Sequence, residues 1–146
     1  KWPLISRFGS DAMVFDVTLT TPGFFALKEL FDVVTELNVK SYFKFTFAFD
    51  PSVVMSPMCL PRDIMEEHVY DLLGYIEPRM TEKTHVYKKS LVNMLQRQTF
   101  DEEFADVKQG LKRGKGYMKY LDSVRADKIE FRDTLSVSAK EWWDGI

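Results

Sequence analysis

Cys59 and His68 are two residues whose types could form a catalytic pair. A nucleophilic cysteine needs a base nearby, and the imidazole of His68 is a candidate for that base. However, His68 lies four residues from both Ile64 and Leu72, which places it at the edge of an apolar helical face. We therefore favour a histidine at the edge of the core over a catalytic histidine.

The metal-ligating residue types do not have the spacing of a metal site. The sequence contains one cysteine and two histidines, Cys59, His68 and His85, and no short spacing joins them. The acidic run from Asp101 to Glu103 lacks the alternating oxygen ligands of a calcium loop, and carboxylates at such a place favour the start of a helix. We expect neither a metal nor a cofactor.

A basic segment, residues 108–120 (KQGLKRGKGYMKY), has the composition of an anion-binding site. Backbone amides at a glycine-rich helix start can bind phosphate, and two tyrosines are interleaved with the cations. The Walker pattern is absent, so we favour a solvated helix end whose charges complement its own dipole. The alternative is contact with RNA, phosphate or an acidic partner. The candidates for anion binding are Lys112, Arg113, Lys115 and Lys119.

Aromatic residues gather at both ends of the chain. Trp2 and Phe8 lie near the start, and Trp142 and Trp143 lie near the end. Tryptophan is enriched at interface hot spots, and two adjacent tryptophans on a short helix cannot face the same core. These four residues are the interface candidates. One tryptophan is expected to meet a partner or the N-terminal arm, and interface and internal packing stay equal alternatives.

Length and charge limit the functional classes. A chain of 146 residues has the size of one domain and can bury about two-thirds of its unfolded surface. The net charge of −2 argues against nucleic-acid binding through the whole surface. A lone cysteine forms no internal disulfide and favours an intracellular reducing compartment. No apolar run approaches the ~20 residues that span a bilayer. The start at Lys1 favours a removed targeting peptide, and with it the mitochondrial matrix.

The most regular pattern predicts a βαβ unit over residues 13–49. Apolar residues alternate through residues 13–20, and Phe43, Phe45, Phe47 and Phe49 share one face of a second strand. Between the strands, residues 21–37 have the three- and four-residue spacing of a helix, with Thr21 as N-cap and Pro22 at the first position. We expect a parallel crossover, preceded by a docking arm over residues 1–12.

Helices are predicted for residues 61–127. The expected spans are 61–77, 81–98 with Thr81 as cap, and a helix from the capping box of Thr99 and Glu102 that breaks at Gly114 or Gly116. A further helix over 117–127 would bury Tyr120, Leu121 and Val124. Residues 129–137 fit a third strand and a continued helix equally well. A capping box of Ser138 and Glu141 predicts a short terminal helix. The fold class is α+β, in one domain over residues 1–146.

The run FDVTLTTPGFFALKELFDVVTELNVKSYFKF resembles the opening βαβ unit of thioredoxin-like proteins, in the branch of kappa-class glutathione transferases and DsbA-type oxidoreductases. It lacks the cysteine pair of the DsbA type, so the resemblance implies a degenerate member of that fold. In kappa-class transferases a Ser-Pro at this turn assists the glutathione thiol, and Thr21-Pro22 would take its place. A hydroxyl at a helix N-terminus can stabilise a thiolate. Thr21 as a simple N-cap remains the favoured interpretation.

We expect a non-catalytic accessory or scaffold subunit of a larger, organellar assembly. It would dock through the terminal aromatics and the basic segment, because no convincing nucleophile, base or metal set accompanies them. One alternative is a glutathione-dependent transferase or isomerase that uses Thr21 of the Thr21-Pro22 turn. A second alternative is an RNA- or phosphate-binding protein that uses residues 108–120.

Overall fold

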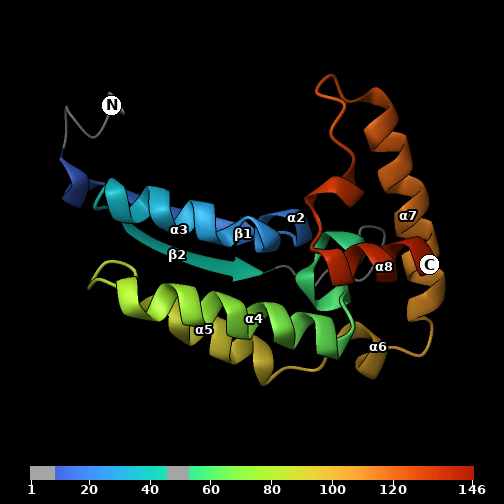
Figure 1. The fold of residues 1–146 in the computed structure, drawn as a ribbon, viewed down its shortest axis with the longest axis horizontal. Helices are drawn as coiled ribbons and strands as arrows, with labels where there is room; N and C mark the ends of the chain where they lie inside the picture. The colour runs from blue at the N-terminus through green and yellow to red at the C-terminus, as the bar shows by residue number, and fades with distance from the viewer. Residues whose placement is uncertain (1–8, 46–52) are drawn as a thin grey trace.

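The computed structural model describes residues 9–45 and 53–146. Figure 1 shows a short sheet with its helices, and a long helix that stands apart from them. Trp2, Phe8, Phe47 and Phe49 lie outside the described residues, as does most of the arm expected over residues 1–12. In chain order the elements are η1 (Ser10–Ala12), β1 (Val14–Leu19), α2 (Thr21–Phe25), α3 (Leu27–Glu36), β2 (Lys40–Phe45), η2 (Val53–Met55), η3 (Pro57–Cys59), α4 (Arg62–Ile76), η4 (Glu77–Arg79), α5 (Val86–Leu95), α6 (Phe100–Glu103), α7 (Val107–Val124), η5 (Phe131–Thr134) and α8 (Val137–Gly145).

The two strands pair in parallel, as the βαβ pattern predicted. The register runs from Val14 opposite Lys40 to Leu19 opposite Phe45. Exposed and covered positions alternate along both strands, which is the signature of a sheet with one packed face. A parallel strand pair followed by a mainly helical half confirms the α+β class.

The crossover consists of two helices, where the sequence predicted one. At Ala26 the backbone leaves helical geometry (φ −97°, ψ 15°), so α2 ends there and α3 begins at Leu27. The N-cap is Thr20, whose hydroxyl accepts from the amide of Gly23 at 3.3 Å. The prediction of Thr21 as N-cap is therefore wrong by one residue. Thr21 occupies the first helical position, and its side chain turns into the protein.

Aromatic side chains join the sheet to the helices that cover it. Tyr87 of α5 is fully buried, with its ring 5.1 Å from that of Phe43 and 5.7 Å from that of Phe31 on α3. Its hydroxyl lies 2.8 Å from Ser41 Oγ on β2, which satisfies two buried polar groups. Burial of this apolar cluster drives the packing of α3 and α5 against β2.

Of the next three helices, α4 lies where the sequence predicted it, whereas α5 and α6 are shorter than predicted. Pro61 immediately precedes α4. Of the six residues that the apolar spacing places on its inner face, Leu73 is half-buried and the other five are buried: Ile64, Met65, Val69, Leu72 and Ile76. The prediction of Thr81 as the cap of the next helix is wrong, because the chain forms a turn after Thr81 and α5 (Val86–Leu95) begins only at Val86. The capping box of Thr99 and Glu102 is confirmed. The α6 helix it opens ends at Glu103, because Phe104 adopts extended geometry. No helix among the described residues is long and apolar enough to cross a membrane.

The helix α7 runs without a break through Gly114 and Gly116, so the predicted break at either glycine is wrong. Gly114 is buried because α7 passes close to η2: a Cβ at this position would lie 2.7 Å from Val54 Cγ1. The expected burial of Tyr120 and Val124 is also wrong, since their exposed fractions are 63% and 62%. Unbroken α7 turns these two residues to the outside.

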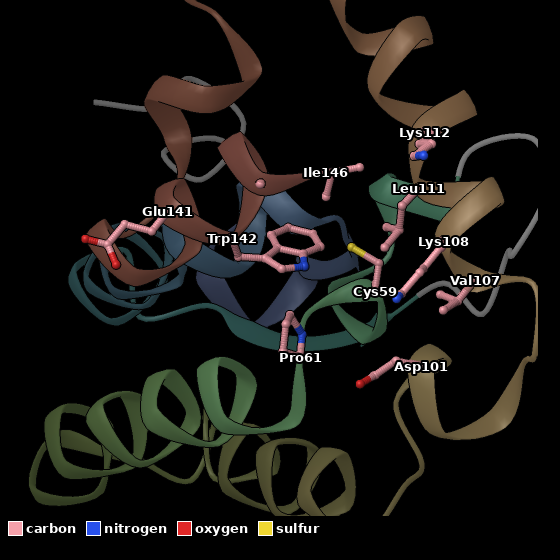
Figure 2. A pocket seen from close by; sticks show the side chains of 11 residues that line it. Cys59, Pro61, Asp101, Val107, Lys108, Leu111, Lys112, Glu141, Trp142 and Ile146 are labelled. Atoms are coloured by element: carbon pink, nitrogen blue, oxygen red, sulfur yellow. The ribbon is translucent and has the colours of Figure 1, made fainter.

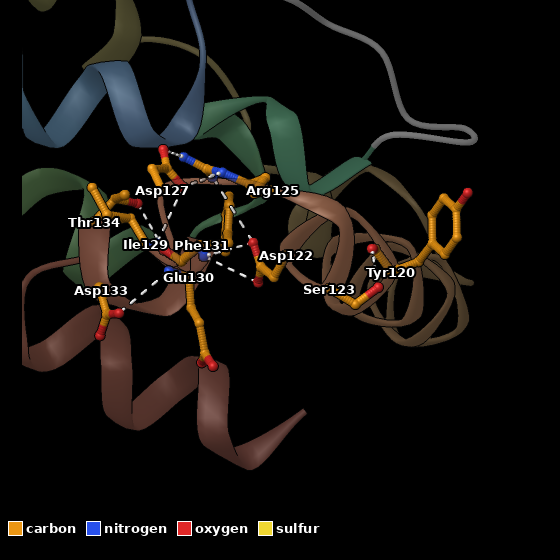
Figure 3. Close-up of polar contacts among 10 residues, drawn as sticks. All are labelled: Tyr120, Asp122, Ser123, Arg125, Asp127, Ile129, Glu130, Phe131, Asp133 and Thr134. Atoms are coloured by element: carbon orange, nitrogen blue, oxygen red, sulfur yellow. Dashed lines mark hydrogen bonds and ion pairs between the residues drawn. The ribbon is translucent and has the colours of Figure 1, made fainter.

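Residues 129–137 form neither a third strand nor a continued helix. After Val124 the chain leaves α7 in extended geometry, and the amide of Phe131 donates to the carboxylate of Asp122 at 3.1 Å (Figure 3). These contacts turn the chain back into η5 and then α8. Ser136 caps α8 by accepting from the amide of Ala139 at 3.3 Å, so the capping box predicted at Ser138 is wrong.

Candidate functional site

Thr21 and Cys59 meet inside the protein. Thr21 Oγ1 donates a hydrogen bond of 2.7 Å to the carbonyl oxygen of Val54 and lies 3.9 Å from Cys59 Sγ. Thr21 has no exposed surface. Burial raises the pKa of the Cys59 thiol to about 12, against the opposite effect of the Thr21 hydrogen bond. The thiol is therefore protonated at neutral pH, and the Thr21 hydroxyl is engaged away from solvent.

His68 is the core-edge histidine that the sequence favoured. Its Nε2 lies 3.0 Å from the carbonyl oxygen of Phe24, and its ring packs 4.6 Å from the Phe24 ring and 4.7 Å from the Phe25 ring. Burial lowers the pKa of this imidazole. His68 is hydrogen-bonded to the backbone of Phe24, and Cys59 contacts Thr21. The two residues therefore do not form the thiol–imidazole pair considered from the sequence.

Residues 9–45 and 53–146 contain no cluster of metal-ligating side chains. No group of three or more His, Cys, Asp or Glu side chains there could hold a metal ion. His85 lies on the surface with Nδ1 2.6 Å from the carbonyl oxygen of Glu82. Asp101 accepts from the hydroxyl of Thr99 at 2.7 Å, in the first turn of α6.

The unbroken α7 divides the basic segment between two flanks. Lys108, Lys112, Lys115 and Lys119 follow one another at intervals of four, three and four residues, so they form a single line, which we call the lysine stripe. At ~100° per residue, Tyr117 and Tyr120 lie on average about 140° away around the helix axis, on the flank of Arg113. The tyrosines and lysines that interleave in the sequence therefore face different surroundings.

Lys115 holds the end of α8. Its Nζ donates to the carbonyl oxygen of Trp143 at 2.5 Å and to that of Asp144 at 3.4 Å, and lies 5.4 Å from the centre of the Trp143 ring. A cation at the C-terminal end of a helix offsets its negative dipole end. Arg132 adds a bidentate contact to the carboxylate of Asp144, at 2.8 and 2.6 Å. The Lys115 contacts join α8 to α7, and the Arg132 contacts join α8 to η5.

The two tryptophans have different environments, as expected for adjacent residues on one helix. Trp143 is 5% exposed and packs 4.8 Å from the ring of Phe131. Trp142 is half-buried, with its ring 6.1 Å from that of Trp143. Trp143 is thus an internal anchor, and Trp142 is the tryptophan left at the surface.

Trp142 and two stripe lysines line one groove of about 640 Å³. Figure 2 shows Trp142 of α8 on one wall, Lys108 and Lys112 of α7 on the other, and Cys59 and Pro61 between them. The apolar part of the lining is Cys59, Pro61, Val107, Leu111, Trp142 and Ile146. Asp101 and Glu141 are its acidic members. The volume and the apolar lining with a few charges are typical of a binding site.

The sequence indicates Trp142 and Lys112 as separate candidates, and no local pattern predicts that they line the same groove. Their meeting depends on the unbroken α7 and on the return of the chain through η5. The four-three-four spacing of the lysines predicts one line of cations, provided that the helix continues through Gly114 and Gly116. Nothing in the sequence indicated that Cys59 and Pro61 would lie between the two walls.

No family model matches this sequence, and neither a curated protein nor a solved structure matches the chain. The resemblance of the opening βαβ unit to thioredoxin-like proteins stays a prediction.

Proposed function

We propose that this chain is a non-catalytic accessory subunit that binds another protein of its assembly through the groove between α7 and α8. The observation that carries the proposal is the meeting of Trp142 with Lys108 and Lys112 around one groove. Tryptophan is enriched at interface hot spots, and charged side chains beside it select a partner of complementary charge. The partner would insert an apolar side chain against Trp142, between the two helices.

The state of the reactive groups supports a binding role over a glutathione-dependent reaction. The enzyme alternative requires the Thr21 hydroxyl to face a bound thiol, whereas this hydroxyl is buried and donates to Val54. Cys59 lies beside the groove as a protonated thiol, because burial raises its pKa to about 12. A protonated, buried thiol contributes apolar lining and no nucleophile.

Site-specific photo-crosslinking tests this proposal. A photoreactive phenylalanine analogue replaces Trp142 in one variant and Tyr70 in a control, because Tyr70 is 61% exposed on α4, away from the groove. We expect a covalent adduct to one protein from position 142 and none from position 70. The same protein, purified, should then bind the unmodified chain. No adduct from position 142, or equal adducts from both positions, would overturn the proposal.

A further inference from the structure

We infer that the segment received by the groove is acidic, with carboxylates that align on the lysine stripe. This inference rests on the proposed function and names the chemistry of the partner. The stripe exists because α7 continues through Gly114 and Gly116, and from Lys108 to Lys119 it extends over about 16 Å at 1.5 Å per residue. It begins at the groove and continues along α7 beyond it.

Three of the four lysines have charge available for a partner. Lys115 is engaged with α8, whereas Lys108, Lys112 and Lys119 are exposed. Among the residues that the structure describes, none of these three forms an ion pair. No acidic residue occurs between Asp106 and Asp122, so the stripe itself contains no internal compensation.

Most acidic groups around the stripe already have partners. Asp144 accepts from Arg132, Asp101 accepts from Thr99, and Asp122 accepts from the amide of Phe131. Glu130 belongs to the capping box of η5. Glu141 is the exposed carboxylate on the opposite wall of the groove. Of these contacts, only that of Asp144 with Arg132 neutralises a charge, because the Thr99 hydroxyl and the Phe131 amide leave the charges of Asp101 and Asp122 in place. The excess of positive charge is that of α7 itself, which has the four stripe lysines and no carboxylate between Asp106 and Asp122. This excess favours an anionic segment.

The position of the aromatic rings favours an acidic polypeptide over a single-stranded nucleic acid. Nucleic-acid strands bind where bases stack on exposed aromatic rings beside the cations. Here Tyr117 and Tyr120 lie on the other flank of α7, and the ring on the lysine side is Trp142, half-buried in an apolar groove. An extended peptide spaces alternate side chains ~6.6 Å apart, close to the distance between lysines four residues apart on a helix.

Fluorescence anisotropy with the purified full chain tests the inference. The probe is a labelled peptide with one leucine followed by three glutamates at alternate positions. Its controls are the same peptide with glutamines, and a 15-nucleotide polyuridine RNA. We expect the glutamate peptide to bind the most tightly, and its affinity to fall about tenfold when salt rises from 50 to 300 mM, because exposed charges are screened.

Charge reversal locates the contact. Lys112→Glu should weaken the binding of the glutamate peptide about tenfold. Lys89→Glu makes the same change at an exposed position on α5, and it should leave the affinity within about twofold of wild type. A peptide with lysines in place of the glutamates should bind Lys112→Glu better than wild type. Tighter binding of the RNA, or equal effects of the two reversals, would overturn the inference.

If the protein captured at position 142 binds independently of salt and Lys112, the inference falls while the proposed function stands. If no protein is captured, the proposed function falls, whatever the peptide does.

Discussion

Replacement of Gly114 by alanine should destabilise the protein, although alanine is the better helix former. The added Cβ would lie 2.7 Å from Val54 Cγ1, 3.1 Å from Val54 Cγ2 and 3.3 Å from Val53 Cγ1. Valine is stiff at χ1, and the backbone of Val54 is held by the hydrogen bond from Thr21, so this neighbour cannot yield easily. We expect the clash to cost about 3 kcal/mol, the upper end of the range for overpacking. The gain of ~1 kcal/mol in helix propensity leaves a net loss of about 2 kcal/mol.

Gly116 provides a matched control two residues further along α7. A Cβ at this exposed position meets nothing within 4 Å, so Gly116→Ala should stabilise the protein by about 1 kcal/mol. Urea unfolding followed by circular dichroism measures both variants against wild type. The two free energies of unfolding should differ by about 3 kcal/mol, which corresponds to roughly 10 °C in Tm.

A second substitution shows whether the loss comes from the contact with Val54. In the Gly114→Ala background, Val54→Ala removes the two nearer of the three methyl groups that the new Cβ would meet, and only Val53 Cγ1 at 3.3 Å remains. The two changes should couple by about 1 kcal/mol or more in a double-mutant cycle. If Gly114→Ala is as stable as Gly116→Ala, α7 does not pack on η2 in this way, and the continuous lysine stripe loses its support.

Three further predictions concern titratable groups. Cys59 should react with a thiol reagent at pH 8 at least about 100-fold more slowly in the folded protein than in urea, because burial raises its pKa to about 12; equal rates would show an accessible thiol. Hydrogen bonds from Arg62 and the Thr99 amide lower the pKa of Glu102 to about 2, so this carboxylate stabilises the fold above pH ~4.3 and the effect is lost as pH falls towards 2. Glu102→Gln should therefore flatten the acid limb of a stability–pH curve, and an unchanged limb would refute that contact. Burial lowers the pKa of His68, so its neutral form stabilises the fold fully above pH ~6.5, and this contribution declines below that pH. NMR titration of the folded protein should give a midpoint for the imidazole below the midpoint of His68 in the unfolded chain. A midpoint equal to or above the unfolded value would contradict the packing of His68.

Patterns that depend on neighbours in the chain were predictable from the sequence. The alternation in β1 and β2 and the buried face of α4 each follow from side-chain period alone, and the structure confirms them. The capping box of Thr99 and Glu102 is equally local. Such signals need no knowledge of what packs against the element.

Features set by tertiary contacts were not predictable in the same way. Thr20 and Thr21 are chemically equivalent caps, and the burial of Thr21 against Val54 and Cys59 decides between them. Glycine usually breaks a helix, yet Gly114 is retained within α7 where the helix approaches Val54. The candidate groove depends on tertiary contacts in the same way, because Trp142 and Lys112 meet only if α7 is continuous and α8 folds back beside it.

The docking role of the groove is tested most directly by the Kd of the protein captured at position 142. Titration calorimetry would compare wild type with Trp142→Ala and, as control, Tyr70→Ala, with circular dichroism to show that each variant is folded. Loss of a hot-spot tryptophan costs about 2 kcal/mol, so Trp142→Ala should weaken binding roughly 30-fold. Tyr70→Ala should leave the Kd within about twofold of wild type. A Kd for Trp142→Ala equal to that of wild type would contradict the account.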